Sequence, residues 1–296
     1  MSSAKYIPTS LTPGEPICSL VPPGQCQLKD TFTPIPLLER IAVSKTSSIL
    51  RFGLPDPNQP LNLSTCACIL AKASMKKQQM ETGSQDGDYE DVIRPYTPIS
   101  TNALKGCFDL LIKNYAPTGK LSRYLHEIPI GTNVEFKHSN ANVKIQAPFH
   151  QKHIVMIAGG TGITPMIQAL HAILGDSDKN DGTHVTLIYG SRVADDILAQ
   201  ELLDAWSKTY SNRFTLVHIL SHEPDDKTSL WTGPRGHITK EVLETYVPNP
   251  TMGEDLIIFV CGPPPMYDAL CGPRNDKELT GTLAEMGYHA NQVYKF

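Results

Sequence analysis

The pattern of hydrophobic and polar positions changes at about residue 150. Before that point, short runs rich in apolar and β-branched residues are separated by Pro, Gly and Asn; they are LLERIAVSKTSSILRFGLP, LSTCACILAKAS, CFDLLIKNYAP, NVEFKH and VKIQ. Short runs with turn residues between them are typical of antiparallel sheets. We therefore predict an antiparallel β-barrel domain over residues 31–150. One helix, GKLSRYLHEI, is expected within it, with Ser122 as its N-cap.

After residue 150, strand-like and helix-like segments alternate. The strand-like segments are HIVMIAG, HVTLIYG, RFTLVHIL and LIIFVCG, and the helix-like segments include PMIQALHAIL, DDILAQELLDAWSKTY and TKEVLETYV. This alternation predicts right-handed crossovers and a parallel sheet covered by helices on both faces. Residues 151–296 are therefore predicted to form a Rossmann-like α/β domain, which binds its ligand beyond the carboxyl ends of the strands.

Two segments lie outside this pattern. Residues 1–30 are rich in Pro, Ser and Thr and are expected to form a flexible leader. Residues 80–92, METGSQDGDYEDV, are acidic and rich in Gly, and we expect a mobile surface loop there. A leader followed by domains at 31–150 and 151–296 agrees with the usual size of domains, which suggests about two for a chain of 296 residues.

Composition narrows the class of protein. The formal net charge of -4 gives no basic face for nucleic acid, and no apolar run approaches the roughly 18 residues that span a bilayer. The seven cysteines are odd in number and irregularly spaced, which favours reduced thiols inside a cell over a disulfide framework or a zinc site. For the histidines, including His150 and His153, we expect solvated or capping roles and no metal site. The hydrolase signature G-x-S-x-G is absent.

The first candidate motif is the turn AGGTGITPM. A buried strand leads into Gly159, Gly160 and Gly162, and Thr164 and Pro165 are expected to open a helix. N–H groups at the start of a helix bind anions, and glycine lets a flat ring or a pyrophosphate approach the backbone. The pattern favours a cofactor-binding turn, with a tight strand-to-helix turn that binds nothing as the alternative.

The second motif is RPYTPIS, residues 94–100. Its prolines hold the backbone extended, so Arg94 and Tyr96 face one way and Thr97 the other. The motif therefore offers a cation for phosphate, an aromatic face and a small hydroxyl for a ring nitrogen. An edge strand with a surface arginine is the alternative.

Two further motifs follow the same logic. In LLIKNYAPTGKLSRYL, Lys113 and Tyr115 alternate on a strand, and Gly119 precedes a helix start that forms a second anion site. An ordinary strand, turn and capped helix is the alternative there. In FVCGPPPMYDAL, Cys261 and Gly262 end a strand, and three prolines make a rigid lip. No histidine is close in sequence to activate this thiol, so we expect no nucleophilic chemistry, and a buried apolar role is the alternative.

These four motifs, in this order, resemble those of the NADH–cytochrome b5 reductase family, which belongs to the ferredoxin-reductase-like flavoenzymes. The resemblance runs from about Phe32 to Phe296. It implies an FAD-binding barrel followed by an NAD(P)H-binding domain. It also implies hydride transfer from NAD(P)H to FAD, and then single-electron transfer to cytochrome b5 or a similar small haem protein.

The resemblance also implies roles for individual residues. Thr97, near the flavin N5, and Cys261, beside the nicotinamide, are the expected catalytic residues, while Arg94 is expected to pair with FAD phosphate and Tyr96 to lie against the flavin. The other expected FAD-binding residues are Pro95, Ile112, Lys113, Tyr115, Gly119, Lys120, Leu121 and Ser122. The other expected NAD(P)H-binding residues are Gly160, Thr161, Gly162, Thr164, Ser191, Arg192, Gly262, Pro263 and Met266.

The chain departs from the family pattern at two places. Relatives usually carry Gly-Gln-His where this chain has Cys66-Ala67-Cys68, and we expect changed packing there. NADH-preferring relatives often have an aspartate where Ser221 stands, and Arg192 ends the second strand of the α/β domain. NADPH is therefore an alternative electron donor to NADH.

The chain contains no haem segment, so the electron acceptor is expected to be a separate molecule. One alternative is a flavin reductase that passes electrons to an iron–sulfur protein, a quinone or a hydroxylase. Another is a nucleotide-binding interaction protein without redox activity. We expect a cytoplasmic monomer, with mitochondrial or membrane-peripheral association as the alternatives.

Overall fold

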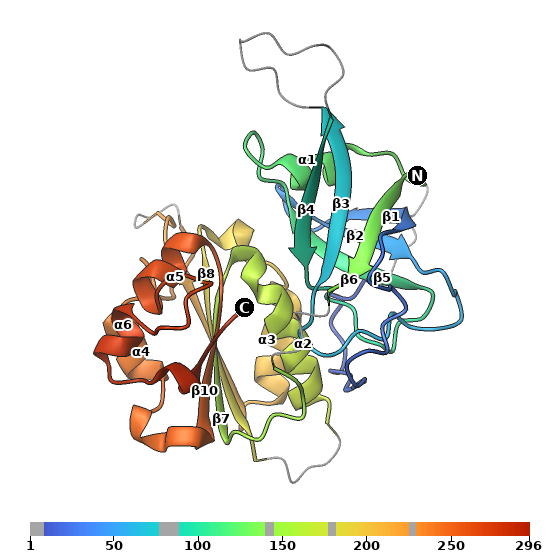
Figure 1. Cartoon of the computed structure of the whole chain (residues 1–296). Coiled ribbons are helices and arrows are strands. Elements are labelled where there is room, and N and C mark those ends of the chain that lie inside the picture. Colours follow the sequence, from blue (N-terminus) through green and yellow to red (C-terminus); the bar gives the residue numbers. More distant parts are fainter. Residues whose placement is uncertain (1–8, 77–88, 140–144, 177–181, 225–228) are drawn as a thin grey trace. The chain divides into compact units, whose positions relative to one another are not determined.

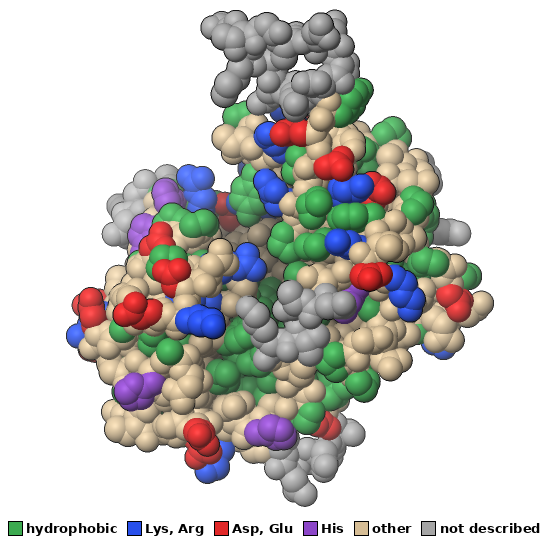
Figure 2. All heavy atoms as spheres, in the orientation of Figure 1, with side chains coloured by type: hydrophobic (Ala, Val, Ile, Leu, Met, Phe, Trp, Pro, Cys, Tyr) green, Lys and Arg blue, Asp and Glu red, His purple; other side chains and the backbone are tan. Residues whose placement is uncertain are grey.

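The structure, a computed structural model, describes residues 9–76, 89–139, 145–176, 182–224 and 229–296. The chain divides into two compact units. One unit is Ser19–Gln146, and the other is Ala147–Phe296 together with the segment that ends at Cys18. Figure 2 shows acidic and basic side chains interspersed on the visible face of each unit.

The unit Ser19–Gln146 is built on one antiparallel sheet, curved into a half-barrel. Its strands are β1 (Thr33–Ala42), β2 (Ser47–Gly53), β3 (Ile69–Lys76), β4 (Tyr89–Tyr96), β5 (Cys107–Lys113) and β6 (Asn133–His138), in the order β4-β3-β6-β1-β2-β5. Three phenylalanines pack together in the core of this unit. The ring centroid of Phe52 lies 5.7 Å from that of Phe108 and 4.8 Å from that of Phe136. The predicted antiparallel domain is confirmed.

Some predicted element boundaries in this unit are wrong. The run from Leu63 becomes a strand only at Ile69, because Cys66 takes a left-handed φ of 62°. The helix α1 (Lys120–Glu127) begins before Ser122, so Ser122 is not its N-cap; Gly119 holds that position without a side-chain cap. The predicted strand VKIQ lies partly outside the described residues, since only its residues 145 and 146 are described. Residues 80–88 of the predicted acidic loop lie wholly outside them, and residues 89–92 belong to β4.

The unit Ala147–Phe296 is built on a parallel sheet, as predicted. Its strands are β7 (His153–Gly159), β8 (His184–Ser191), β9 (Phe214–Leu220), β10 (Leu256–Cys261) and β11 (Val293–Lys295), in the order β11-β10-β7-β8-β9. Its helices are α2 (Ile163–Leu174), α3 (Gln200–Thr209), α4 (Lys240–Tyr246), α5 (Pro264–Leu270) and α6 (Gly281–Glu285). Within this unit, α2 and α3 cover one face of the sheet and α4, α5 and α6 cover the other (Figure 1).

Helix α2 starts earlier than predicted. A single 3-10 turn, Gly160–Gly162, follows β7, and α2 begins at Ile163. Thr164 is therefore the second helical residue and is buried, so it does not cap the helix. The glycine turn thus leads directly into a helix whose first N–H groups have no side-chain cap.

Part of the expected flexible leader is bound to α2 and α3. Ile17 N donates a hydrogen bond to His171 Nδ1 at 3.0 Å, and Trp206 Nε1 donates to the carbonyl oxygen of Gly14 at 2.7 Å. Tyr210 Oη donates to a carboxylate oxygen of Glu15 at 2.7 Å. These contacts fix residues 14–17 on the second unit. Among the described residues, every helix is too short or too polar to cross a bilayer.

Candidate functional site

The end of β4 brings together the residues of the RPYTPIS motif. Arg94 is exposed, and its guanidinium donates to the carbonyl oxygen of Ile93 at 2.7 Å. Burial raises the pKa of the Tyr96 phenol, with a smaller opposing effect from Arg94 and a smaller supporting one from Tyr115. The three side chains therefore share one neighbourhood, and Thr97 follows them half-buried. This edge offers a cation, two aromatic rings and a hydroxyl, which fits a flavin nucleotide.

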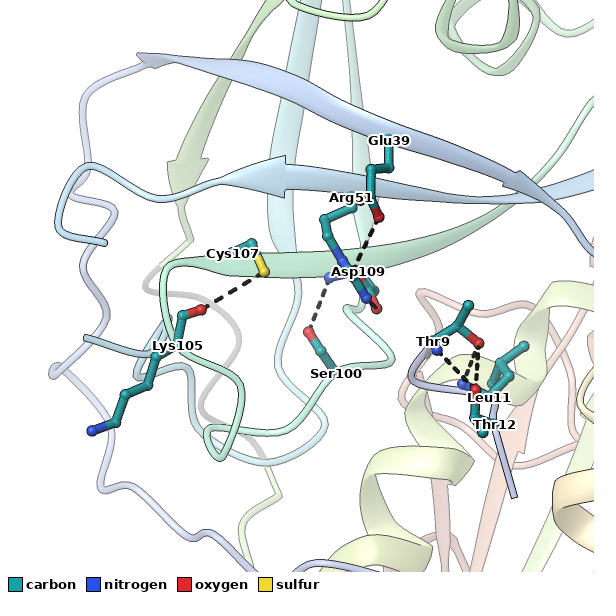
Figure 3. A network of polar contacts seen from close by, with 9 residues as sticks. All are labelled: Thr9, Leu11, Thr12, Glu39, Arg51, Ser100, Lys105, Cys107 and Asp109. Carbon is teal, nitrogen blue, oxygen red and sulfur yellow. Dashed lines mark hydrogen bonds and ion pairs between the residues drawn. The ribbon is translucent and has the colours of Figure 1, made fainter. Parts of the chain in front are cut away.

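A buried ion pair holds the residues after Thr97. Ile99 N donates to the carbonyl oxygen of Asp109 at 2.9 Å, and Asp109 N donates to Ser100 Oγ at 3.0 Å. Arg51 on β2 donates to both carboxylate oxygens of Asp109 and also to Glu39 (Figure 3). Hydrogen bonding to Asp109 raises the pKa of Arg51, so the guanidinium stays charged. The segment behind the motif is thereby tied to β5 and β2, the last two strands of the sheet order.

The turn before α1 forms a second part of this edge. Gly119 N donates to the carbonyl oxygen of Tyr115 at 2.8 Å, and a Cβ on Gly119 would overlap the Ser122 hydroxyl and the Tyr115 side chain. Only glycine fits this turn. The first N–H groups of α1 have no side-chain cap, so a phosphate could accept from them.

The other expected FAD residues divide by exposure. Ile112 and Leu121 are buried in the core, so they support the site by packing. The Lys120 ammonium is paired with Glu90 on β4, which leaves the backbone of Lys120 as its means of holding a phosphate. Pro95 and Tyr115 are exposed, Lys113 is half-buried, and Ser122 is buried.

In the second unit, the two glycine-bearing motifs meet at the carboxyl edge of the sheet. Ala158 on β7 pairs with Cys261 on β10, and a Cβ on Gly162 would overlap the carbonyl oxygen of Cys261. A Cβ on Gly159 would lie 2.9 Å from Met266 Sδ and 3.0 Å from Pro263 Cδ. The backbones of the two motifs therefore touch and form one surface.

The outer side of that surface is open. Gly160 has a left-handed φ of 53°, and a Cβ there would meet nothing within 4 Å. Tyr189 on β8, which the sequence reading missed, fixes the turn by donating from its hydroxyl to the carbonyl oxygen of Gly160 at 2.9 Å. Thr161 and Gly262 are half-buried, and Pro263 is exposed. An open glycine turn beside a rigid proline lip fits a nicotinamide nucleotide.

The ends of β8 and β9 extend this edge. Ser221 N donates to the carbonyl oxygen of Ser191 at 3.0 Å, and His222 N donates to that of Arg192 at 2.8 Å. Ser221 Oγ lies 2.8 Å from His222 Nδ1. The Ser191 side chain is buried, whereas Arg192 is exposed. The side chains along this edge are thus cationic or neutral, and none of them is a carboxylate; they are Arg192, Ser221 and His222.

The carboxylate of Glu223, which follows His222 in the chain, is already engaged. Glu223 accepts from Ser229 Oγ at 2.6 Å and from Ala194 N at 2.8 Å, and these hydrogen bonds lower its pKa. His218 and His222 are four residues apart, but on extended chain this spacing separates them by about 13 Å, too far to share a metal. Across the described part of the chain, no group of three or more His, Cys, Asp or Glu could hold a metal ion.

Comparison with known proteins decides the family. Two protein-family models match the chain. The model described as "Oxidoreductase FAD-binding domain" matches residues 34–145, and the model described as "Oxidoreductase NAD-binding domain" matches residues 156–272. NADH-cytochrome b5 reductase 2 of Aspergillus fumigatus is 41% identical over 258 residues, which cover 86% of this chain and 74% of that protein. The chain belongs to the NADH-cytochrome b5 reductase family.

Further similarities agree with this family. NADH-cytochrome b5 reductase 2 of Neurospora crassa is 37% identical over 299 residues, covering 100% of this chain and 80% of that protein. The solved cytochrome b5 reductase domain of Ulva prolifera nitrate reductase is 29% identical, with a TM-score of 0.73 over 92% of this chain and 99% of that chain. The predicted family, the two-domain fold, the oxidoreductase class and the cofactors FAD and NAD are confirmed.

Proposed function

We propose that the protein is an NADH–cytochrome b5 reductase that oxidises NADH and reduces cytochrome b5 or a similar small haem protein. When bound, FAD supplies the redox chemistry by accepting hydride from the nicotinamide and releasing the electrons one at a time. The observation that carries the proposal is a glycine cradle in each unit, at Gly119 and at Gly162. A Cβ at either glycine would overlap neighbouring atoms, and each glycine directly precedes a helix whose N-terminus has no side-chain cap.

In the barrel unit, we assign the residues around β4 and α1 to FAD. The exposed Arg94 pairs with phosphate, and the Tyr96 ring lies against the flavin. The Thr97 hydroxyl hydrogen-bonds near the flavin N5. The amides that follow Gly119 receive the pyrophosphate, since the Lys120 ammonium is paired with Glu90. No residue in this set has to act as a general base.

In the α/β unit, we assign the carboxyl edge of the sheet to the nicotinamide nucleotide. The amides of the turn Gly160–Gly162 hold the nucleotide, and Cys261 with the proline lip lies beside the nicotinamide. Positioning of the reacting atoms at near-attack distance lowers a barrier by several kcal/mol without any acid or base. Arg192, Ser221 and His222 surround the place for the adenosine ribose, and we propose that they also accept the additional phosphate of NADPH.

The proposed setting is the cytoplasm, with the protein as a monomer. The odd number and irregular spacing of its seven cysteines support a reducing compartment. Cell fractionation with an antibody, and light scattering of the purified protein, test these two points.

The test of the proposed function is an acceptor comparison with the purified protein. We expect a yellow protein that reduces cytochrome b5 when NADH is supplied, faster than it reduces a ferredoxin or a quinone. A colourless protein that takes up no FAD would overturn the proposal. A protein that reduces a quinone but not cytochrome b5 would overturn the choice of acceptor.

A further inference from the structure

A buried tyrosine joins three segments at the carboxyl edge of the parallel sheet. Tyr267 lies on α5, and its hydroxyl donates to the carbonyl oxygen of Phe296 at 2.7 Å. The same hydroxyl lies 3.2 Å from the carbonyl oxygen of Val260, which also accepts the N–H of Phe296 at 3.0 Å. The phenol therefore closes a ring of hydrogen bonds between α5, β10 and the residue that follows β11.

The Tyr267 phenol also faces the thiol of Cys261. Burial, and then the neighbouring Cys261, raise the pKa of Tyr267, and the two side chains are within hydrogen-bond reach. A phenol has one proton, and the 2.7 Å contact directs it to Phe296. Its oxygen is then left to accept hydrogen bonds from the Cys261 thiol and from the backbone N–H of Gly262.

Cys261 is in turn in contact with the glycine turn. Its carbonyl oxygen occupies the space that a Cβ on Gly162 would need. A shift at the end of β10 would therefore move the thiol and the turn together.

We propose that Tyr267 is a positioning residue for the nicotinamide nucleotide. Its hydroxyl holds the Cys261 side chain and the end of β10 against the turn Gly160–Gly162, and it contacts no cofactor itself. This inference rests on the proposed function, because that function assigns the nicotinamide to this edge. It predicts that loss of one hydroxyl, behind the site, weakens NADH binding.

The experiment compares Tyr267→Phe with a matched variant, Tyr288→Phe. The Tyr288 hydroxyl donates to the carbonyl oxygen of Pro248 at 2.7 Å, and both tyrosines are buried in the same unit. Each variant loses one buried phenolic hydrogen bond, so both should lower the melting temperature by a similar amount. We expect only Tyr267→Phe to raise the KM for NADH, by roughly two- to ten-fold, since one hydrogen bond contributes about 0.5–1.5 kcal/mol. FAD content should stay unchanged in both.

A second measurement does not depend on NADH turnover. Iodoacetamide alkylation of Cys261, followed on its peptide by mass spectrometry, should be several-fold faster in Tyr267→Phe because the thiol is released. Tyr288→Phe should alkylate Cys261 at the wild-type rate. If Tyr267→Phe matches Tyr288→Phe in both KM and alkylation, the inference is overturned.

The two proposals can fail separately. If the wild type oxidises no NADH, the proposed function fails, and the alkylation rates alone decide whether Tyr267 holds Cys261. If Tyr267→Phe does not fold, the pH dependence of Cys261 alkylation in the wild type decides instead. A thiol held as a donor to the phenol should ionise at higher pH than the same thiol in the guanidinium-unfolded chain. Equal profiles would overturn the inference.

Discussion

The carboxylate of Asp109 on β5 is fully buried, and Arg51 on β2 donates to it from two nitrogens, at 2.8 Å and 3.0 Å. Since the backbone of Asp109 also binds Ile99 and Ser100, this pair links the barrel core to the segment after Thr97 (Figure 3). The charges of Arg51 and Asp109 thus help to hold in place the segment that carries the proposed flavin-binding residues.

We predict that Asp109→Asn destabilises the barrel unit by about 3 kcal/mol, because the Arg51 guanidinium loses the charge that compensates it. Urea unfolding monitored by the release of FAD measures this change. Glu127→Gln is the control, since Glu127 pairs with Arg123 on an exposed helix surface and should change stability by under about 1 kcal/mol. Equal effects of the two substitutions would refute the structural role of the buried pair.

Gly162→Ala tests the cradle in the α/β unit. The new methyl group has to displace the Cys261 carbonyl, and overpacking of this kind costs about 1–3 kcal/mol. We expect the KM for NADH to rise at least about five-fold, which corresponds to the lower end of that range. Gly182→Ala is the control, because a Cβ there meets nothing within 4 Å. An unchanged KM in Gly162→Ala would contradict the assignment of the turn.

Thr97→Val tests the role of the hydroxyl near the flavin. We expect FAD to stay bound, and reduction of the bound flavin by NADH to slow roughly five- to ten-fold, the value of one lost hydrogen bond. Stopped-flow absorbance measures that rate. Thr97→Ser keeps the hydroxyl and should restore most of it. Reduction of Thr97→Val at the wild-type rate would remove Thr97 from the mechanism.

Ser221→Asp tests the use of NADPH. A carboxylate beside Arg192 and His222 would repel the additional phosphate of NADPH, so kcat/KM for NADPH should fall about ten-fold or more. The value for NADH should stay within about two-fold. Ser211→Asp adds the same charge at an exposed position before β9 and is the control. If Ser221→Asp leaves the ratio of kcat/KM for NADPH to kcat/KM for NADH unchanged, this edge does not recognise the additional phosphate of NADPH.

From the hydrogen bond between Ile17 and His171, we predict that the protein loses stability in acid. Burial lowers the pKa of His171 from 6.5 to about 4, so the ring is neutral and its Nδ1 accepts from Ile17. Because the unfolded chain takes up a proton first, stability should begin to fall as the pH drops below 6.5. The fall should be complete near pH 4, with a total of roughly 3 kcal/mol for this group.

Tryptophan fluorescence during urea unfolding measures this loss, because the ring of Trp206 lies 4.8 Å from that of His171. His153 and His218 have lowered pKa values as well and contribute with the same sign. His171→Gln removes only the share of His171, so its stability should depend less steeply on pH between 4 and 6.5 than that of the wild type. An identical slope would show that His171 titrates normally in the folded protein.

Four strands of the parallel sheet could be predicted almost to the residue, because each is a largely apolar run that has to be buried, whereas the short β11 (Val293–Lys295) was not predicted. The two glycine motifs of the α/β unit could also be placed on the correct strand ends, whereas the prediction that Tyr115 shares a strand with Lys113 is wrong, because β5 ends at Lys113. The start of α1 could not be predicted, since the preference of serine for an N-cap was outweighed by the tight packing around Gly119. Tyr267 was missed because its partners, Val260 and Phe296, belong to other segments.

The contacts of the leader segment could not be predicted for a similar reason. Its composition is that of a flexible segment, but Gly14 and Ile17 bind Trp206 and His171, which composition cannot reveal. The pairing of distant segments depends on surfaces that form only when α2 and α3 pack on the sheet.

The position of residues 14–17 has a consequence for biosynthesis. Ile17 and Gly14 leave the ribosome well before their partners, because His171 and Trp206 lie 154 and 192 positions later in the chain. The whole of Ser19–Gln146 is made in between. The barrel can therefore fold on the nascent chain before residues 14–17 have a partner, and the second unit is complete only when these residues pack against α2 and α3.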